Sequence, residues 1–145
     1  MQYAEKGACM TDKECKAVFN SVFDQYSKEM WIHEGDPGRG NGACAYIIRR
    51  EIILPEGTFE SPEEWDILVL LHEVGHIKTN TPKMKTYEKE YRAVQWSATE
   101  ARKLGLHIRG EWRKAYQEYI WKKRQMCINR KGKNIASKES LVIQW

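Results

Sequence analysis

The sequence predicts an α+β fold for a single domain, mostly helical, with a small β-sheet or hairpin beside one apolar helix. A chain of 145 residues has the size of one domain with its own core. Apolar residues recur at helical spacing in four segments, residues 11–30, 62–79, 87–104 and 111–127. A β-rich segment lies between the first two of them. Within the single domain, residues 1–145, we expect an active-site core at about 43–105 and a basic helical part at about 106–145.

The first predicted helix, residues 11–30, begins with a capping box. The Thr11 hydroxyl can accept a hydrogen bond from the N–H of Glu14, and the Glu14 carboxylate can accept one from the N–H of Thr11. Six apolar residues then follow helical spacing: Cys15, Val18, Phe19, Val22, Phe23 and Tyr26. The glycine-rich run at 35–42 cannot continue a helix and predicts a loop.

Residues 43–54 predict β-structure. Apolar side chains alternate in two phases, with Arg49, Arg50 and Glu51 interrupting the pattern. The segment is therefore either one long strand or two short strands folded as a hairpin.

The second predicted helix starts at about Pro62. Ser61 suits the N-cap, Pro62 the first helical position and Glu64 the capping box. The helix is apolar on nearly all sides, which is typical of a buried helix, and it ends at the Thr-Asn-Thr-Pro run of 79–82.

Two more helices follow. The helix at 87–104 ends at Gly105, a suitable C-terminal cap, and the next runs from 111 to about 127. The last residues, 141–145, form a terminal strand or dock as a tail.

The buried helix carries the motif H-E-x-x-H as His72-Glu73-Val74-Gly75-His76. Histidines at i and i+4 share one helix face, so both imidazoles can bind one Zn²⁺ at about 2.0–2.1 Å. Glu73 can act as the base for a water molecule that the metal activates. Buried imidazoles also need partners, because an unsatisfied polar group costs about 1–3 kcal/mol. The motif predicts zinc ligands at His72 and His76 and a catalytic base at Glu73.

A catalytic zinc site needs a third protein ligand. The extended motif H-E-x-x-H-x-x-G-x-x-H would require glycine at 79 and histidine at 82, where this chain has Thr79 and Pro82, so that class is excluded. Five candidates remain, three of them carboxylates: Glu88, Glu90, Glu100, His107 and His33.

Among these candidates, helix packing favours Glu90. Mostly small residues share its helix face at Ala93, Val94, Ser97 and Ala101, which allows a close approach to another helix. Gly75 is the small residue of the motif helix, so we expect Glu90 to lie against it and reach the metal. Glu88 lies about 160° around the helix from Glu90 and is expected to be solvated.

Two segments, residues 71–77 and 88–97, together resemble the ImmA/IrrE family of metallopeptidases, which phages and mobile elements carry. That family shows H-E-[LIV]-G-H and later E-x-E-x-x-A-x-x-[WF]-A, and the resemblance covers about residues 43–105. It implies a zincin-like fold of gluzincin type, with His72, His76 and a glutamate of the second motif as ligands and Glu73 as base. Arg92 stands where many members have another glutamate, and Ser97 replaces the usual alanine.

Charge is distributed unevenly along the chain. Residues 101–145 carry 12 Lys and Arg against 3 Asp and Glu, which leaves 12 against 17 for residues 1–100. With Trp112, Tyr116 and Trp121 interleaved, this basic part is a candidate surface for nucleic acid or an acidic protein. The helical spacing of the aromatic residues favours a simpler interpretation, in which the basic face is solvated and the aromatic face packs in the core.

The sequence also predicts where the protein acts. It has no run of 18 apolar residues and no apolar run near its start, so we expect no membrane segment and a cytoplasmic location, in a bacterium or a phage-infected cell. The four cysteines show no C-x-x-C spacing and are expected to be reduced.

These features predict a zinc-dependent endopeptidase that cuts an intracellular protein, and the resemblance implies a phage or mobile-element repressor as that substrate. Candidates for stabilising the oxyanion are Tyr87, Tyr91, Arg92 and His107. Two alternatives are a nucleic-acid-associated protein with a structural or vestigial zinc site, and a DNA-linked protease similar to the SprT-like family with His107 as third ligand. A third is an inactive binding protein that keeps the fold.

Overall fold

Helices dominate the part of the chain that the computed structural model describes, residues 10–36, 42–131 and 134–145. The predicted loop at 35–42 falls largely on residues 37–41, which lie outside the described residues. In chain order the described elements are α1 (Asp12–Tyr26), β1 (Trp31–Glu34), β2 (Cys44–Tyr46), β3 (Glu51–Leu54), α2 (Glu64–Thr79), α3 (Thr86–Lys103), α4 (Gly110–Lys131) and a short 3₁₀ helix, η1 (Lys138–Leu141). The predicted α+β class is confirmed.

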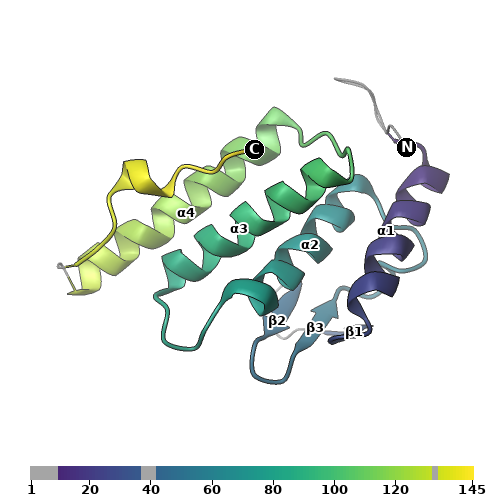
Figure 1. Ribbon diagram of the computed structural model, residues 1–145, viewed down its shortest axis with the longest axis horizontal. Coiled ribbons are helices and arrows are strands. Elements are labelled where there is room, and N and C mark those ends of the chain that lie inside the picture. Colours follow the sequence, from purple (N-terminus) through teal and green to yellow (C-terminus); the bar gives the residue numbers. More distant parts are fainter. Residues whose placement is uncertain (1–9, 37–41, 132–133) are drawn as a thin grey trace.

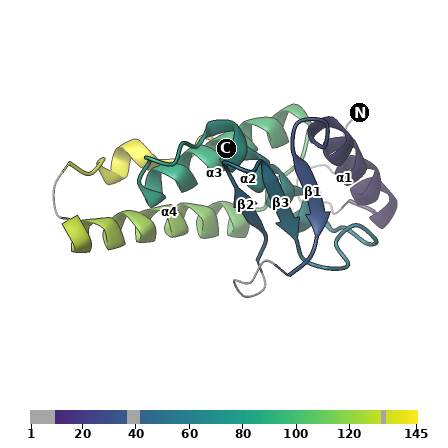
Figure 2. The same cartoon turned by 90° about the horizontal axis from the view of Figure 1, so that it is seen from below.

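The α-helices lie side by side in the order α4, α3, α2, α1 (Figure 1). The sheet packs on α2 through β2 and β3 (Figure 2). Its strand order is β1-β3-β2, with β1 parallel and β2 antiparallel to β3. Of the two alternatives for residues 43–54, the hairpin is therefore the one present, and β2 is an edge strand beside the motif helix α2.

Strand β1 was not predicted from the sequence, which placed a helix up to residue 30. The helix ends at Tyr26, and the next residues turn the chain so that Trp31–Glu34 can pair with β3. The Trp31 N–H donates to the Arg50 carbonyl at 2.9 Å, and the Gly35 N–H donates to the Leu54 carbonyl at 2.9 Å. A strand of four residues depends on this partner, which lies about twenty residues further along the chain.

The helix starts follow local capping, with one difference from the prediction. The capping box of α1 is present, since Glu14 N–H donates to Thr11 Oγ1 and Thr11 N–H to Glu14 Oε1, both at 3.1 Å. Helix α2 starts at Glu64, two residues later than predicted, and its N-cap is Glu63 rather than Ser61. Asp66 stabilises this start, because its Oδ2 accepts the Glu63 N–H at 2.8 Å.

Two groups of buried apolar residues hold the helices together. The larger joins α1, the sheet and α2, with Phe19, Ile52 and Leu70 almost fully buried. The smaller joins α3, α4 and the C-terminal segment, where Ile120 and Ile143 are buried. The last residues dock as a tail rather than as a strand.

Backbone hydrogen bonds to side chains hold this tail in place. Gln117 donates to the Leu141 carbonyl at 2.7 Å and accepts the Ile143 N–H at 2.8 Å. Before η1, the Tyr87 hydroxyl accepts the Ala136 N–H at 3.0 Å, which connects the segment that leads into η1 to the first turn of α3.

Helices α2 and α3 come very close together at Gly75. A Cβ added to Gly75 would lie 2.7 Å from the carbonyl oxygen of Ala93 and 3.1 Å from its Cα. The expected close approach of the small-residue face of α3 to Gly75 is therefore present. This contact sets the position of α3, and with it the position of Glu90, one turn earlier on the same helix.

We expect Gly75→Ala to lower the free energy of unfolding by about 1–3 kcal/mol, because the α3 backbone must move away from the new methyl group. Helix propensity alone would favour alanine by about 1 kcal/mol, so a net loss would isolate the steric effect. Chemical denaturation measures it. Gly110→Ala is the control, because nothing lies within 4 Å of a Cβ at Gly110. A Gly75→Ala protein as stable as its parent would contradict this account of the α2–α3 contact.

Candidate metal centre

Helix α2 carries His72 and His76 on one face, with their rings directed toward the same point. The Nε2 atoms lie 3.1 Å apart, and the rings are nearly perpendicular, at 89°. Both side chains are largely buried, because the helix is covered on almost every side by α1, α3 and the sheet. The i, i+4 spacing therefore brings two imidazole nitrogens to one place.

Helix α3 brings Glu90 to this point from the other side. Its Oε2 lies 3.0 Å from His72 Nε2 and 3.3 Å from His76 Nε2. The approach depends on the α2–α3 contact at Gly75. Three candidate ligand atoms, two nitrogens and one oxygen, thus form a triangle with edges of 3.0, 3.1 and 3.3 Å.

The dimensions of this triangle suit a tetrahedral cation. Ligand atoms about 2.0–2.2 Å from such an ion lie about 3.3–3.6 Å apart, so the observed edges of 3.0, 3.1 and 3.3 Å are equal to this separation or a few tenths of an ångström shorter. Glu90 Oε2 is buried and accepts no well-aligned hydrogen bond from the described residues, although two ring nitrogens are adjacent. Two imidazoles and one carboxylate are also a ligand set of catalytic zinc sites, in which a fourth position stays open. The residues present therefore fit zinc.

The electrostatics of the triangle favour a positive charge at its centre. Burial would lower the pKa of His76, yet contact with the Glu90 carboxylate raises it to about 9. Burial likewise opposes ionisation of Glu90, but the two imidazoles hold the pKa of Glu90 well below its usual range. A proton on His76 offsets the negative charge of the Glu90 carboxylate, and a divalent cation bound between them would offset it more strongly.

Glu73 lies beside the same point. Ligand atoms of His72, Glu73 and His76 all lie within 4.8 Å of one another. Burial raises the pKa of Glu73, although the neighbouring histidines oppose this shift. A carboxylate with a raised pKa next to a metal site is suited to accept and return a proton.

Asn80, just after α2, is a site residue that the sequence analysis did not identify. Its Oδ1 lies 2.5 Å from His76 Nδ1, on the side of the ring opposite Glu90. By contrast, His72 Nδ1 is buried without a hydrogen-bond partner among the described residues. The only sequence signal for Asn80 was its position four residues after His76, at the end of the helix.

His72, His76 and Glu90 line a pocket of about 880 Å³. Its lining residues come from three sides: the edge strand β2 and its flanks contribute Ala43, Cys44, Ala45 and Ile47, α2 contributes Trp65 and Val69, and α4 contributes Ala115, Tyr116 and Tyr119. A large pocket with few polar groups at its base is typical of a ligand or substrate site.

The tyrosines near the site come from α4, a helix that the sequence predicted but to which it assigned no role at the metal site. The Tyr116 ring stacks on His72 with 5.5 Å between centroids, and burial and the carboxylates of Glu90 and Glu73 raise the pKa of Tyr119 to about 12. Of the four predicted oxyanion-stabilising residues, Tyr87, Tyr91, Arg92 and His107, none lines this pocket. Helix α4 is distant in sequence, so only the fold brings its tyrosines here.

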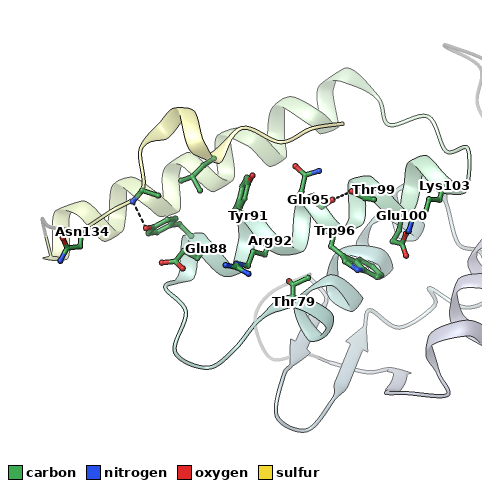
Figure 3. Close-up of a pocket in the computed structure, with 13 residues that line it drawn as sticks. Thr79, Glu88, Tyr91, Arg92, Gln95, Trp96, Thr99, Glu100, Lys103 and Asn134 are labelled. Atoms are coloured by element: carbon green, nitrogen blue, oxygen red, sulfur yellow. Dashed lines mark hydrogen bonds and ion pairs between the residues drawn. The ribbon is translucent and has the colours of Figure 1, made fainter.

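The other candidate third ligands lie elsewhere. Glu88 and Glu100 line a separate pocket of about 780 Å³ on another side of α3, where Arg92 and Lys103 also lie (Figure 3). Glu100 accepts the Tyr26 hydroxyl at 3.2 Å and pairs with Lys103 at 3.0 Å. Arg92 is exposed, so position 92 does not face the histidine pair.

The two remaining histidines are also outside the site. His33, on β1, contacts Glu51 at 2.7 Å, and His107 lies in the connection between α3 and α4. Neither lines the pocket that contains His72 and His76. Of the five candidates, Glu90 is therefore the one that the structure brings to the two histidines.

Residues of the basic part of the chain make packing contacts and hydrogen bonds within the protein. Trp112, Tyr116 and Trp121 are half-buried and pack on the two apolar clusters. Arg113 donates to the Ile108 carbonyl at 2.9 Å and Arg124 to the Ala136 carbonyl at 2.7 Å. These contacts support the simpler interpretation, in which one face of the basic part is solvated and its aromatic face packs against the protein.

Cys15, Cys44 and Cys127 are free thiols, and Cys9 lies outside the described residues. Within the described parts of the chain, each helix is too short or too polar to span a membrane.

Comparison with models of protein families, with curated proteins and with solved structures finds no match for this chain. The ImmA/IrrE-like pattern of residues 71–77 and 88–97 therefore stays a resemblance. The candidate metal centre is defined by its own residues, with His72, His76 and Glu90 at the centre and Glu73 and Asn80 beside it.

Proposed function

We propose that this protein is a zinc-dependent endopeptidase. The observation that carries the proposal is the convergence of His72 Nε2, His76 Nε2 and Glu90 Oε2 within 3.3 Å of one another, at the base of an open pocket. When bound there, zinc would polarise the scissile carbonyl and lower the pKa of a water molecule to about 7.

In this proposal Glu73 moves the proton. It takes a proton from the attacking water and passes it to the nitrogen of the leaving amine, so that no free hydroxide or amide anion is released. Its burial supports this role, because the raised pKa of Glu73 brings the carboxyl group closer to the pH at which it works.

The edge strand β2 beside the pocket favours an extended polypeptide as substrate. Among the described residues, strand β2 pairs only with β3, and residues of β2 line the pocket. A peptide backbone can pair with the other edge by strand addition, while its side chains contact Trp65 and Tyr116. The substrate that the family resemblance suggests is a repressor of a phage or mobile element in the bacterial cytoplasm.

The test combines metal analysis with a cleavage assay. We expect the purified protein to bind one zinc per chain, and to cut members of a peptide library in a manner that chelation abolishes and zinc restores. Glu73→Gln protein then serves as a trap for the natural substrate in a bacterial lysate. A zinc-loaded, folded protein that cuts neither the library nor any trapped protein would overturn the endopeptidase proposal, and His72→Ala protein that binds zinc normally would overturn the site.

A further inference from the structure

We infer that Asn80 is a positioning residue, which holds the His76 ring with Nε2 free for metal and ties it to the backbone beside Glu90. This inference rests on the proposed zinc site, but it concerns a residue outside the three ligands and the base. It is carried by a closed set of hydrogen bonds around one buried amide.

The backbone of Asn80 places its side chain against the end of α2. Its N–H donates to the His76 carbonyl at 3.0 Å, and its extended conformation, φ −91° and ψ 151°, ends the helix. The residue is buried, with 7% of its surface exposed. Its side chain reaches back to the ring of His76, where Oδ1 lies 2.5 Å from Nδ1.

Neighbouring acceptors fix the orientation of the amide group. The Thr79 hydroxyl donates its single proton to the Gly75 carbonyl at 2.8 Å, so toward Asn80 it can only accept. The Lys89 carbonyl also can only accept. The Asn80 amide nitrogen lies 3.1 Å from each of these oxygens and must be the group that faces them. Asn80 Oδ1 therefore faces His76.

This orientation determines the tautomer of His76. Asn80 Oδ1 is a carbonyl oxygen and accepts, so Nδ1 of His76 carries the hydrogen. In the neutral ring the lone pair is then on Nε2, the atom directed toward Glu90 and His72. Metal-binding histidines commonly have their second nitrogen held in this way, which fixes the ring and makes it a better ligand.

The same amide connects both halves of the site. Asn80 follows α2, and Lys89 directly precedes Glu90 on α3, so the bond from Asn80 to the Lys89 carbonyl joins the two helices next to their metal-facing residues. Since His72 Nδ1 has no hydrogen-bond partner among the described residues, His76 is the more firmly held of the two imidazoles. Loss of Asn80 should therefore loosen His76 and Glu90 together.

The experiment compares zinc affinity, measured by competition with a chromophoric chelator, in the parent protein, Asn80→Ala, Asn80→Asp and Thr79→Ala. We expect Asn80→Ala to weaken zinc binding by about 10–100-fold. Asn80→Asp keeps an acceptor for His76 Nδ1 but loses the donor to the Lys89 carbonyl, so it should recover part of the affinity. Thr79→Ala removes one of the two acceptors that orient the amide but leaves the bonds to His76 and the Lys89 carbonyl, so it should weaken zinc binding far less than Asn80→Ala. Cobalt substitution adds a spectroscopic readout, in which only Asn80→Ala should change the visible absorption.

The outcomes separate this inference from the proposed function. Chemical denaturation of the metal-free variants shows whether a change in affinity merely follows a change in stability. Asn80→Ala protein that binds zinc like the parent, or equal losses in Asn80→Ala and Asn80→Asp, would overturn the positioning role while the zinc site stands. A parent protein that binds no zinc would overturn both.

Discussion

Replacing Glu73 with glutamine is expected to leave zinc bound and to slow peptide cleavage by about 10²–10⁴-fold, the usual contribution of a general base. Glutamine has the shape of glutamate but cannot take a proton from water. The proposed ligands His72, His76 and Glu90 are untouched, so metal content by mass spectrometry should equal that of the parent. Cleavage rates are measured on a peptide identified from the library.

The fold should survive this change. Burial raises the pKa of Glu73, which means that the buried site disfavours its charge, and a neutral amide removes that cost. Thermal unfolding of the metal-free protein checks this point. Glu88→Gln is the matched control, because Glu88 lines the other pocket and should leave cleavage unchanged. Unchanged cleavage in Glu73→Gln protein would refute the proposed mechanism.

Local sequence signals predicted the helices that build the site. The capping box at Thr11, the apolar character of residues 64–79 and Gly105 after α3 are properties of neighbouring residues, and the structure follows them closely. The close α2–α3 approach also followed from sequence, because a glycine on one helix and a row of small residues on the other permit it. That inference placed Glu90 next to the two histidines.

Features that depend on distant partners could not be predicted in the same way. Strand β1 has four residues and forms on β3, and the α4 tyrosines reach the pocket only when α4 packs on α3. Asn80 looked like a simple helix terminator, because two of its three side-chain partners, His76 and the Lys89 carbonyl, come together only in the folded protein. The start of α2 was misplaced because Ser61-Pro62 is a strong local signal, whereas Glu63 and Asp66 supply the actual cap.

Removing the Glu90 carboxylate is expected to weaken zinc binding by more than the roughly 10–100-fold typical for groups that only support a ligand. Glu90 Oε2 comes from another helix and lies within 3.3 Å of both Nε2 atoms. Without it the two histidines of α2 are left as a two-ligand site, too few for a catalytic zinc. Glu90→Gln and Glu90→Ala should both show the loss, and glutamine preserves the packing if alanine destabilises α3.

Two matched variants make this prediction decisive. Glu100 lies on the same helix and contacts Tyr26 and Lys103, and His107 lies beyond the end of α3, so Glu100→Gln and His107→Ala should bind zinc like the parent. Affinity is again measured by competition with a chelator. Zinc binding that survives loss of Glu90 but disappears in His107→Ala would contradict the His-His-Glu centre. It would instead favour the histidine-ligated alternative, which requires His107 to move toward α2. We expect the first outcome, because Glu90 Oε2 already lies 3.0 Å from His72 Nε2, where both can bind one ion.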